Sequence, residues 1–294
     1  MNLKKELPGI KENVSLADYT TFRIGGEARY FYTAKDKEKA VKALLLAKEL
    51  NLPFFVLGGG SNILIADDGF KGLVVSFQFS DIDFKDNKIF CGAGLSLALL
   101  LSEAAKKGLS GLEWGAGIPG TVGGAIRGNS GAFGDSMVSA INKVEVFNLA
   151  SKKTENYSQE DCSFDYRESV FKRRPELVIL SAELELKKGD KKEIKEKMKE
   201  CLDYRQETQP LGFPSAGSVF KNLPDMPAGQ LIEKCGLKGK KIGGAQISEK
   251  HANFIVNVNQ AKAADVIRLI ELAKQEVMDR FNVNLEEEIQ YLGF

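Results

Sequence analysis

The order of apolar and polar positions along the chain predicts a mixture of helices and strands. Apolar residues recur at helical spacing over residues 37–50, and Asp36 just before them is suited to cap that helix. A second helix is predicted over residues 96–107, where Gly108 follows at the position that favours a left-handed glycine. Apolar runs or period-two alternation predict strands at residues 54–57, 72–77, 88–91, 143–149 and 178–186.

A long charged helix separates the first part of the chain from the last. Residues 190–209 are mostly charged, and Pro210 ends the helix that they predict. Beyond it the pattern predicts a helix at 228–235, a strand at 254–258, a helix at 261–281 and a final strand at 285–292. Because strands and helices do not alternate strictly, we expect an α+β fold rather than a doubly wound sheet, with the charged helix connecting two domains.

Length and charge narrow the classes of function. At roughly 150 residues per domain, the 294 residues suggest about two domains. The 41 Lys and Arg nearly balance the 40 Asp and Glu, so there is no basic excess for nucleic acid and no polybasic segment for an anionic membrane. We therefore predict neither a nucleic-acid partner nor a membrane partner.

The start of the chain and its cysteines bear on the compartment. The opening MNLKKELPGIKENV lacks an apolar signal region, and no apolar run approaches the ~18 residues that span a bilayer. The four cysteines form no C-x-x-C pair, and His251 is the single histidine. We expect a cytoplasmic protein with reduced thiols and no metal site, in which His251 is structural rather than a catalytic base.

Glycine is unevenly distributed. The chain holds 29 glycines among 294 residues, above the usual ~7%, and nine of them lie between Gly111 and Gly134. Without a Cβ, consecutive residues can direct N–H groups into one concavity that binds phosphate oxygens. GGGSN at 58–62 and GAGIPGTVGG at 115–124 predict two such nests for one long diphosphate ligand. The alternative, that these glycines only form tight turns, stays open.

Two familiar phosphate motifs can be set aside. Gly115, Gly117 and Gly120 satisfy G-x-G-x-x-G, but the preceding LSGLEW is a poor strand and no β-α-β unit surrounds it. No G-x-x-x-x-G-K-[ST] occurs in the chain. We expect neither a Rossmann dinucleotide site nor nucleotide hydrolysis of the P-loop kind.

The combination of motifs resembles the UDP-N-acetylenolpyruvoylglucosamine reductase family over nearly the whole chain. The matching stretches, in the family's order, are YTTFRIGG (19–26), LGGGSN (57–62), GAGIPGTVGGAIRGNSGAFG (115–134), FDYRESVFK (164–172), GSVFKN (217–222) and LEEEI (285–289). The resemblance implies an α+β fold with a two-lobed FAD-binding domain of the vanillyl-alcohol oxidase (PCMH) type and a smaller C-terminal α+β substrate domain. The boundaries expected are 1–208, with lobes of about 1–85 and 86–208, and 209–294. The length suggests the family's shorter subtype.

The same resemblance implies an activity. NADPH would reduce non-covalently bound FAD, whose N5 then delivers hydride to the enolpyruvyl ether of UDP-N-acetylglucosamine-enolpyruvate, giving UDP-N-acetylmuramate for peptidoglycan precursors. By the same resemblance Ser218 donates the proton, and Arg167 and Glu288 stabilise the enolate. This chemistry suits the residues, because a guanidinium grips a carboxylate through two hydrogen bonds and a buried or hydrogen-bonded acid can stabilise an oxyanion.

Two glutamates compete for the third catalytic role, because relatives often read L-E-P-E-V where this chain has LEEEI. The register selects Glu288. Strand alternation would put Glu288 opposite the expected core contacts Leu285, Ile289 and Tyr291, whereas Glu287 would share their face. Glu287 is the competing choice, and both glutamates could simply be solvated.

Further residues are carried over by resemblance alone. Expected contacts of FAD are Arg23, Gly58, Gly59, Gly60, Ser61, Asn62, Gly117, Ile118, Pro119, Thr121, Gly123, Gly124, Asn129 and Gly131. Expected contacts of the UDP-sugar are Tyr166, Arg205, Lys221 and Asn222. Phe133 stands where relatives commonly have tyrosine, and no role follows for Arg127. We expect His251 and Asn253 to organise their loop.

Two other functions compete with this one. The chain could be another flavin oxidase of the same superfamily, although His251 lies far along the sequence from the glycine segments and does not suit covalent flavin attachment. It could also be a nucleotide-sugar binding protein without activity, against which Arg167, Ser218 and Glu288 together argue. We expect a monomer whose NADPH and UDP-sugar use one cleft in turn.

Overall fold

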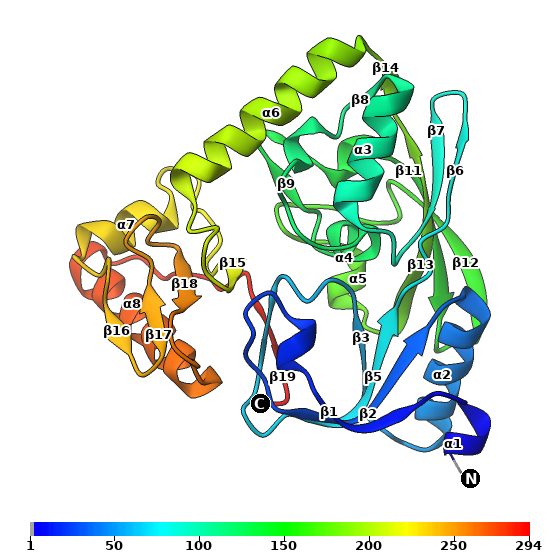
Figure 1. Cartoon of the computed structure of the whole chain (residues 1–294), viewed down its shortest axis with the longest axis horizontal. Coiled ribbons are helices and arrows are strands. Elements are labelled where there is room, and N and C mark those ends of the chain that lie inside the picture. Colours follow the sequence, from blue (N-terminus) through cyan, green and yellow to red (C-terminus); the bar gives the residue numbers. More distant parts are fainter. Residues whose placement is uncertain (1–2) are drawn as a thin grey trace. The chain divides into compact units, whose positions relative to one another are not determined.

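The computed structural model describes residues 3–294, which form two compact units (Figure 1). Unit 1 comprises the described residues up to Ile10 together with Phe31–Gly59 and Leu73–Tyr204. Unit 2 comprises Lys11–Tyr30, Gly60–Gly72 and Arg205–Phe294. Neither unit is continuous in sequence. The expected domains, 1–208 and 209–294, are continuous stretches by contrast, and their assignment to FAD and substrate stays a prediction.

The first part of unit 1 contains a short parallel pair of strands and a helix. Strand β3 (Phe54–Leu57) runs parallel to β5 (Phe70–Phe77), and β2 (Glu27–Ala34) follows β5 in the strand order. Helix α2 (Lys37–Glu49) begins at Asp36, whose carboxylate accepts a hydrogen bond from the Lys39 N–H at 2.8 Å. The predicted cap, helix and strand are confirmed here. Helix α1 spans Leu3–Glu6.

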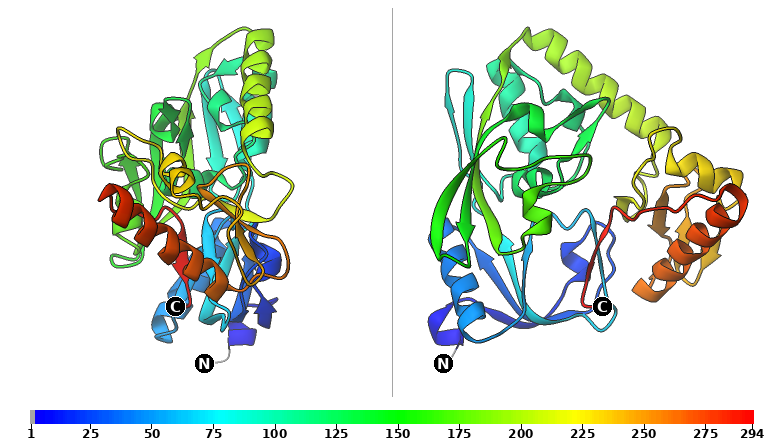
Figure 2. Two further views of the ribbon diagram at one scale, coloured as in Figure 1. Left: turned by 90° about the vertical axis from the view of Figure 1, so that its left-hand side faces the viewer. Right: turned by 180° about the vertical axis from the view of Figure 1, so that it is seen from behind.

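The larger sheet of unit 1 has five antiparallel strands in the order β12-β11-β13-β7-β6. Its strands are β6 (Ile82–Lys85), β7 (Lys88–Gly92), β11 (Ile141–Asn148), β12 (Lys153–Ser158) and β13 (Leu177–Glu185). The central β13 is buried on both faces over most of its length, and α4 and α5 pack against it (Figure 2). The strands predicted near residues 88–91, 143–149 and 178–186 are confirmed.

Two further helices of the structure, α3 and α6, were predicted from the sequence, whereas α4 and α5 were not. Their bounds are α3 (Leu97–Lys107), α4 (Val122–Arg127), α5 (Val170–Arg173) and α6 (Lys191–Thr208). Helix α6 crosses the boundary between the units, because unit 1 ends at Tyr204 and unit 2 resumes at Arg205. Gly108 ends α3 in a left-handed conformation with φ of 72°, as predicted. Before the glycine-rich segment there is only the two-residue strand β8 (Leu109–Ser110) and a 3-10 turn. A Rossmann unit is therefore absent from this segment. The remaining short elements are β9 (Gly131–Ala132), β10 (Asp135–Ser136), β14 (Lys187–Lys188) and the 3-10 turns Glu113–Gly115 and Met137–Ala140.

Unit 2 packs helices against an antiparallel sheet in the order β15-β18-β17-β16 (Figure 1). Its elements are β1 (Lys11–Ser15), the 3-10 turn Ala17–Tyr19, β4 (Ile63–Ile65), β15 (Ser215–Ser218), α7 (Ala228–Lys234), β16 (Lys241–Ile242), β17 (Ala245–Ile247), β18 (Phe254–Asn257), α8 (Ala263–Phe281) and β19 (Gln290–Leu292). Phe22, Ile24 and Leu64 lie in the same buried cluster as the apolar face of α8. Three stretches of chain thus share one core.

The predicted final strand over residues 285–292 is wrong in its extent. Only β19 pairs with another strand, running parallel to β4, so regular pairing begins at Gln290. Leu285 and Ile289 are buried as expected, but Tyr291 is 38% exposed and Leu292 is buried in its place. The alternation fails because the backbone of residues 286–288 follows residues 219–221 instead, as described below.

Candidate active site

The two glycine-rich segments meet within unit 1. A Cβ on Gly59 would lie 2.7 Å from the Cα of Gly120, and a Cβ on Gly58 would lie 2.6 Å from the Thr121 hydroxyl. Neither position accepts a side chain without displacement of its neighbour. The sequence predicted two separate nests. In the structure, the loop that carries Gly58 and Gly59 crosses the loop that carries Gly120 and Thr121.

The backbone N–H groups at this crossing fall into two sets. Within residues 3–294, the N–H groups of Gly58, Gly59 and Gly117 donate to no other group, and all three glycines are exposed. By contrast, the Gly123 N–H donates to the Ala93 carbonyl at 2.9 Å, and the Gly124 N–H donates to the hydroxyl of Thr121, the N-cap of α4. The first set can bind an anion, whereas the second holds the loop together.

Asn129 connects the glycine segment to the turn that carries Arg167. Its side chain is buried; Nδ2 donates to the Asp165 carbonyl at 2.9 Å, and Oδ1 accepts from the Val138 N–H at 3.1 Å. The Gly131 carbonyl accepts a hydrogen bond from Arg167 Nη2 at 2.8 Å. Asn129 and Gly131, expected as contacts of FAD, therefore bind the arginine turn directly.

Arg167 lies at the tip of a tight turn. Asp165 and Glu168 exchange two backbone hydrogen bonds of 3.1 and 3.0 Å, which leaves Tyr166 and Arg167 at the tip. Arg167 has a left-handed backbone with φ of 57°, unusual for a side chain of its size. The Lys172 ammonium donates to the Arg167 carbonyl at 2.8 Å and forms an ion pair with Glu168 at 3.1 Å. The guanidinium carbon lies 5.2 Å from the centre of the Tyr166 ring.

Two residues that the sequence left unassigned lie in the same unit. Burial lowers the pKa of the Arg127 guanidinium and the Glu168 carboxylate partly opposes this, while the Arg127 carbonyl accepts from the Ser169 hydroxyl at 2.6 Å. Phe133 is exposed, and its ring meets that of Tyr204 edge to face at 5.3 Å. The phenyl ring at this position thus packs on another aromatic ring.

Ser218 and Glu288 are brought together in unit 2. Ser218 ends β15, and the carbonyl of the next residue, Val219, accepts from the Glu288 N–H at 2.8 Å. The Glu288 carbonyl in turn accepts from the side-chain amide of Asn62 at 3.2 Å. Both candidate catalytic side chains are half-buried. The predicted proton donor and the predicted glutamate therefore stand on adjacent stretches of backbone, while Arg167 belongs to unit 1.

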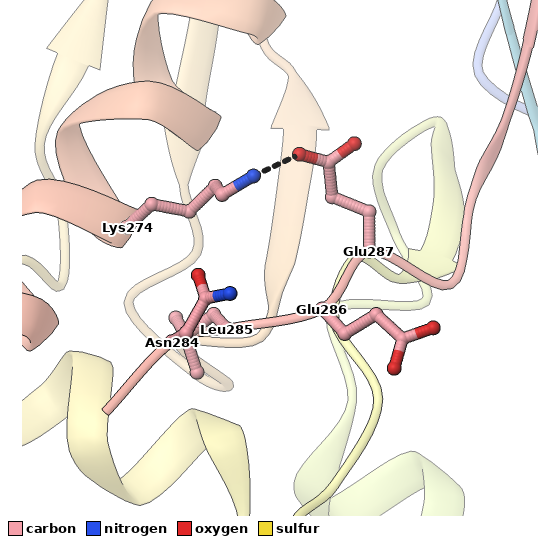
Figure 3. A pocket seen from close by; sticks show the side chains of 5 residues that line it. All are labelled: Lys274, Asn284, Leu285, Glu286 and Glu287. Atoms are coloured by element: carbon pink, nitrogen blue, oxygen red, sulfur yellow. Dashed lines mark hydrogen bonds and ion pairs between the residues drawn. The ribbon is translucent and has the colours of Figure 1, made fainter.

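Glu287 faces a different neighbour. It borders a polar hollow of unit 2 that is lined by Lys274, Asn284, Leu285, Glu286 and Glu287 (Figure 3). The Glu287 carboxylate points to Lys274 and forms an ion pair with it at 2.9 Å, whereas Glu286 points the other way (Figure 3). Burial and a hydrogen bond to Glu287 raise the pKa of the Tyr291 hydroxyl. The Glu287 carboxylate is thus held by Lys274 of the same unit, and the choice between Glu287 and Glu288 as the catalytic glutamate stays a prediction.

The other carried-over residues of unit 2 serve partly structural roles. Gly60 has φ of 60°, and a Cβ there would lie 2.1 Å from the Tyr19 carbonyl oxygen. Lys221 forms an ion pair with Glu286, and the Asn222 side chain accepts from the N–H of Ala228 at 3.2 Å, at the start of α7. Ser61, Asn62 and Lys221 are half-buried, Arg23 and Asn222 are exposed, and Arg205 is buried.

Comparison with known proteins places this geometry in a family. Residues 28–152 match a family described as an FAD binding domain, and residues 209–292 match the C-terminal domain of UDP-N-acetylenolpyruvoylglucosamine reductase. The reductase of Anoxybacillus flavithermus is 41% identical over 99% of this chain and 97% of its own. That of Fervidobacterium nodosum is 44% identical over 95% of this chain and 90% of its own. The chain belongs to the UDP-N-acetylenolpyruvoylglucosamine reductase family.

Solved structures agree with this assignment. The reductase of Thermus caldophilus aligns with a TM-score of 0.83 at 38% identity, over 96% of this chain and 99% of that one. A variant of Phl p 4, a glucose oxidase, aligns at 13% identity with a TM-score of 0.50 over 64% of this chain, which bears on the fold alone. The predicted α+β fold with an FAD-binding domain, the family and the class of FAD-dependent oxidoreductase are confirmed.

The residues of unit 1 fit a flavin dinucleotide. A pyrophosphate needs converging amide donors and close approach of the backbone. Gly58, Gly59 and Gly117 offer exposed N–H groups where a Cβ on either of the first two would collide with Gly120 or Thr121. In this chain, these three glycines are the best candidates for holding the diphosphate of FAD.

Two kinds of feature are absent from residues 3–294. Over residues 3–294, no helix is both long and apolar enough to pass through a membrane. In the same range, no three His, Cys, Asp or Glu side chains gather in a way that would hold a metal ion.

Proposed function

We propose that this chain reduces the enolpyruvyl ether of UDP-N-acetylglucosamine-enolpyruvate to UDP-N-acetylmuramate, a step of peptidoglycan precursor synthesis, with NADPH as the reductant. Support comes from the family's name, from relatives aligned over nearly their whole length, and above all from the backbone hydrogen bond that joins the residue after Ser218 to Glu288 at 2.8 Å. Bound FAD would take hydride from NADPH and deliver it to the methylene carbon of the enolpyruvyl group.

Reduction of the carbon–carbon double bond then requires one proton and a means of carrying negative charge. After hydride addition, charge spreads from the carbon that bears the ether oxygen into the substrate carboxylate. The Ser218 hydroxyl would give its proton to that carbon. Glu288, if protonated, would donate a hydrogen bond to the enolate.

Arg167 would bind the substrate carboxylate. Its guanidinium is always charged and offers paired donors in a planar fork, which matches a carboxylate. The Gly131 carbonyl and the Tyr166 ring both lie against this guanidinium, so its orientation is restricted. A fixed cation at the carboxylate stabilises the enolate more than the ground state, because charge increases there during the reaction.

The finer expectations about binding are part of the same proposal. We propose that residues 1–208 hold FAD and residues 209–294 the UDP-sugar, and that NADPH and the sugar occupy one cleft in turn. The matched segments 28–152 and 209–292 support this division. We also propose a monomer that acts in the cytoplasm.

The proposal is tested by following NADPH oxidation with and without the enolpyruvyl UDP-sugar, using FAD-loaded protein. NADPH should be consumed only when the enolpyruvyl UDP-sugar is present. Ser218→Ala and Glu288→Gln should keep bound flavin and its reduction by NADPH, yet slow reoxidation by the sugar about 10²- to 10⁴-fold, because each removes a group that acts on the developing carbanion.

Glu287→Gln is the matched control, since it makes the same change one residue away in a side chain that Lys274 engages. Glu287→Gln should lower the rate of flavin reoxidation by the sugar far less than Glu288→Gln does. Sugar-independent NADPH consumption by the wild type, or near-normal turnover by Ser218→Ala, would overturn the proposal.

A further inference from the structure

The stretch of chain that follows Ser218 is held by a buried asparagine. Asn253 is only 2% exposed, and its side chain makes two hydrogen bonds to one residue. Oδ1 accepts from the Phe220 N–H at 2.9 Å, and Nδ2 donates to the Phe220 carbonyl at 2.8 Å. The Asn253 carbonyl also accepts from the Val219 N–H at 2.8 Å. Three hydrogen bonds from one residue therefore fix the two residues after Ser218.

The opposite edge of residues 219–221 is held by residues 286–288. The Val219 carbonyl accepts from the Glu288 N–H, and the Lys221 N–H donates to the Glu286 carbonyl, both at 2.8 Å. Every backbone polar group from the Val219 N–H to the Lys221 N–H is therefore bonded, to Asn253 on one side and to residues 286–288 on the other. Any shift of this stretch moves Ser218 relative to Glu288.

The backbone of Asn253 is held in turn by His251. Its N–H donates to Nδ1 of His251 at 3.2 Å, and the His251 ring meets Phe254 edge to face at 4.9 Å. Burial lowers the pKa of His251, and the charge of Lys238 lowers it further. The imidazole therefore stays neutral near pH 7, with Nδ1 available as an acceptor.

We propose that Asn253 is a positioning residue for Ser218, holding the proton donor in place against Glu288. This inference rests on the proposed function. An amide is the side chain suited to the task, because Phe220 presents one donor and one acceptor side by side and Asn or Gln offers the complementary pair without taking up a proton. Asn has the shorter reach of the two, and the half-buried Ser218 hydroxyl depends on a placement that a shift of about 1 Å would spoil.

The test separates the two half-reactions in the FAD-loaded protein. Asn253→Asp keeps the shape and the acceptor but replaces the donor to the Phe220 carbonyl with an oxygen. Reduction of the flavin by NADPH should stay within about twofold of wild type, while reoxidation by the enolpyruvyl UDP-sugar should slow about 10- to 100-fold, the scale of a misplaced catalytic group. The solvent deuterium isotope effect on reoxidation should increase, because proton transfer limits the rate more strongly.

Gln246→Glu is the matched control. Gln246 is also a buried amide of unit 2, and its Nε2 donates to the Gly239 carbonyl at 3.1 Å, so the substitution repeats the change of an amide to an acid away from the Ser218 stretch. It should lower thermal stability but leave reoxidation and its isotope effect as in wild type. In flavin-free protein, hydrogen exchange of a peptide covering residues 216–222 should be faster in Asn253→Asp than in Gln246→Glu.

A milder variant tests the same role if Asn253→Asp does not fold. His251→Phe removes the acceptor behind Asn253 and keeps a ring against Phe254, so reoxidation should slow less, about three- to tenfold. Folded Asn253→Asp with normal reoxidation, or variants in which both half-reactions slow equally, would overturn the positioning role. If the wild type itself shows no sugar-dependent reoxidation, the proposed function fails, and this inference fails with it.

Discussion

Single glycines decide how closely the loops of unit 1 can approach each other. The Cα of Gly120 leaves no room for a Cβ at Gly59, so the approach exists only because position 59 lacks a side chain. The sequence revealed that glycine was concentrated in these loops. It could not show that Gly58 and Gly59 lie against Gly120 and Thr121, because those pairs are some 60 residues apart and nothing in local propensity joins them.

Gly59→Ala should weaken FAD binding about tenfold or more, because a methyl group 2.7 Å from the Gly120 Cα forces the two loops apart. Titration of flavin-free protein with FAD, followed by flavin fluorescence, measures this. Gly212→Ala is the control, since a Cβ there would meet nothing within 4 Å. Equal affinity of Gly59→Ala and wild type would show that this crossing does not hold the cofactor.

At the scale of elements, the turn around Arg167 shows what local pattern can and cannot predict. The longer helices and the strands with a clear apolar run were predicted well, because apolar periodicity and caps act within one segment. Strands β1, β2 and β12 were not predicted. The turn at residues 165–168 was not predicted, although its resemblance to the family marked Arg167. Its left-handed residue costs roughly 1–3 kcal/mol and persists because the surrounding groups hold it. Lys172 supplies two of those contacts.

Lys172→Met should raise the KM for the enolpyruvyl sugar or lower kcat, by about tenfold in kcat/KM, because loss of one charged hydrogen bond to the Arg167 carbonyl costs roughly 1.5–3 kcal/mol before relaxation. Steady-state kinetics with the sugar varied is the measurement. Lys199→Met removes an exposed ion pair to Asp203 on α6 and should change kcat/KM little. Similar kinetics for the two variants would contradict the assignment of Lys172 to the Arg167 turn.

At the scale of the whole molecule, the feature that matters most is that unit 2 is assembled from separated stretches of chain. Phe22, Ile24 and Leu64 enter the core formed by residues beyond 205, and β4 pairs with β19. Each fully buried side chain of this kind contributes roughly 1.5–3 kcal/mol, against a net stability of only about 5–15 kcal/mol for a domain. The C-terminal stretch therefore depends on the N-terminal one.

A fragment of residues 205–294 should accordingly fail to fold by itself, although it contains the whole of α8 and the sheet β15-β18-β17-β16. Thermal unfolding followed by circular dichroism should show no cooperative transition for the fragment and a clear one for the full chain. A cooperative transition in the isolated fragment would mean that Phe22, Ile24 and Leu64 are dispensable to this core.

The sequence by itself determined the parts that depend on local order and on motif identity: the mixed α+β class, the ends of α2 and α3, the family and its flavin. It also named Ser218 and Glu288. Tertiary structure decided the rest. Only folding shows that Glu287 turns to Lys274, that residues 286–288 follow residues 219–221 instead of joining a strand, and that Asn253 holds the residues after Ser218. These pairings are long-range, and their free energy comes from burial and hydrogen bonds that no local pattern of residues encodes.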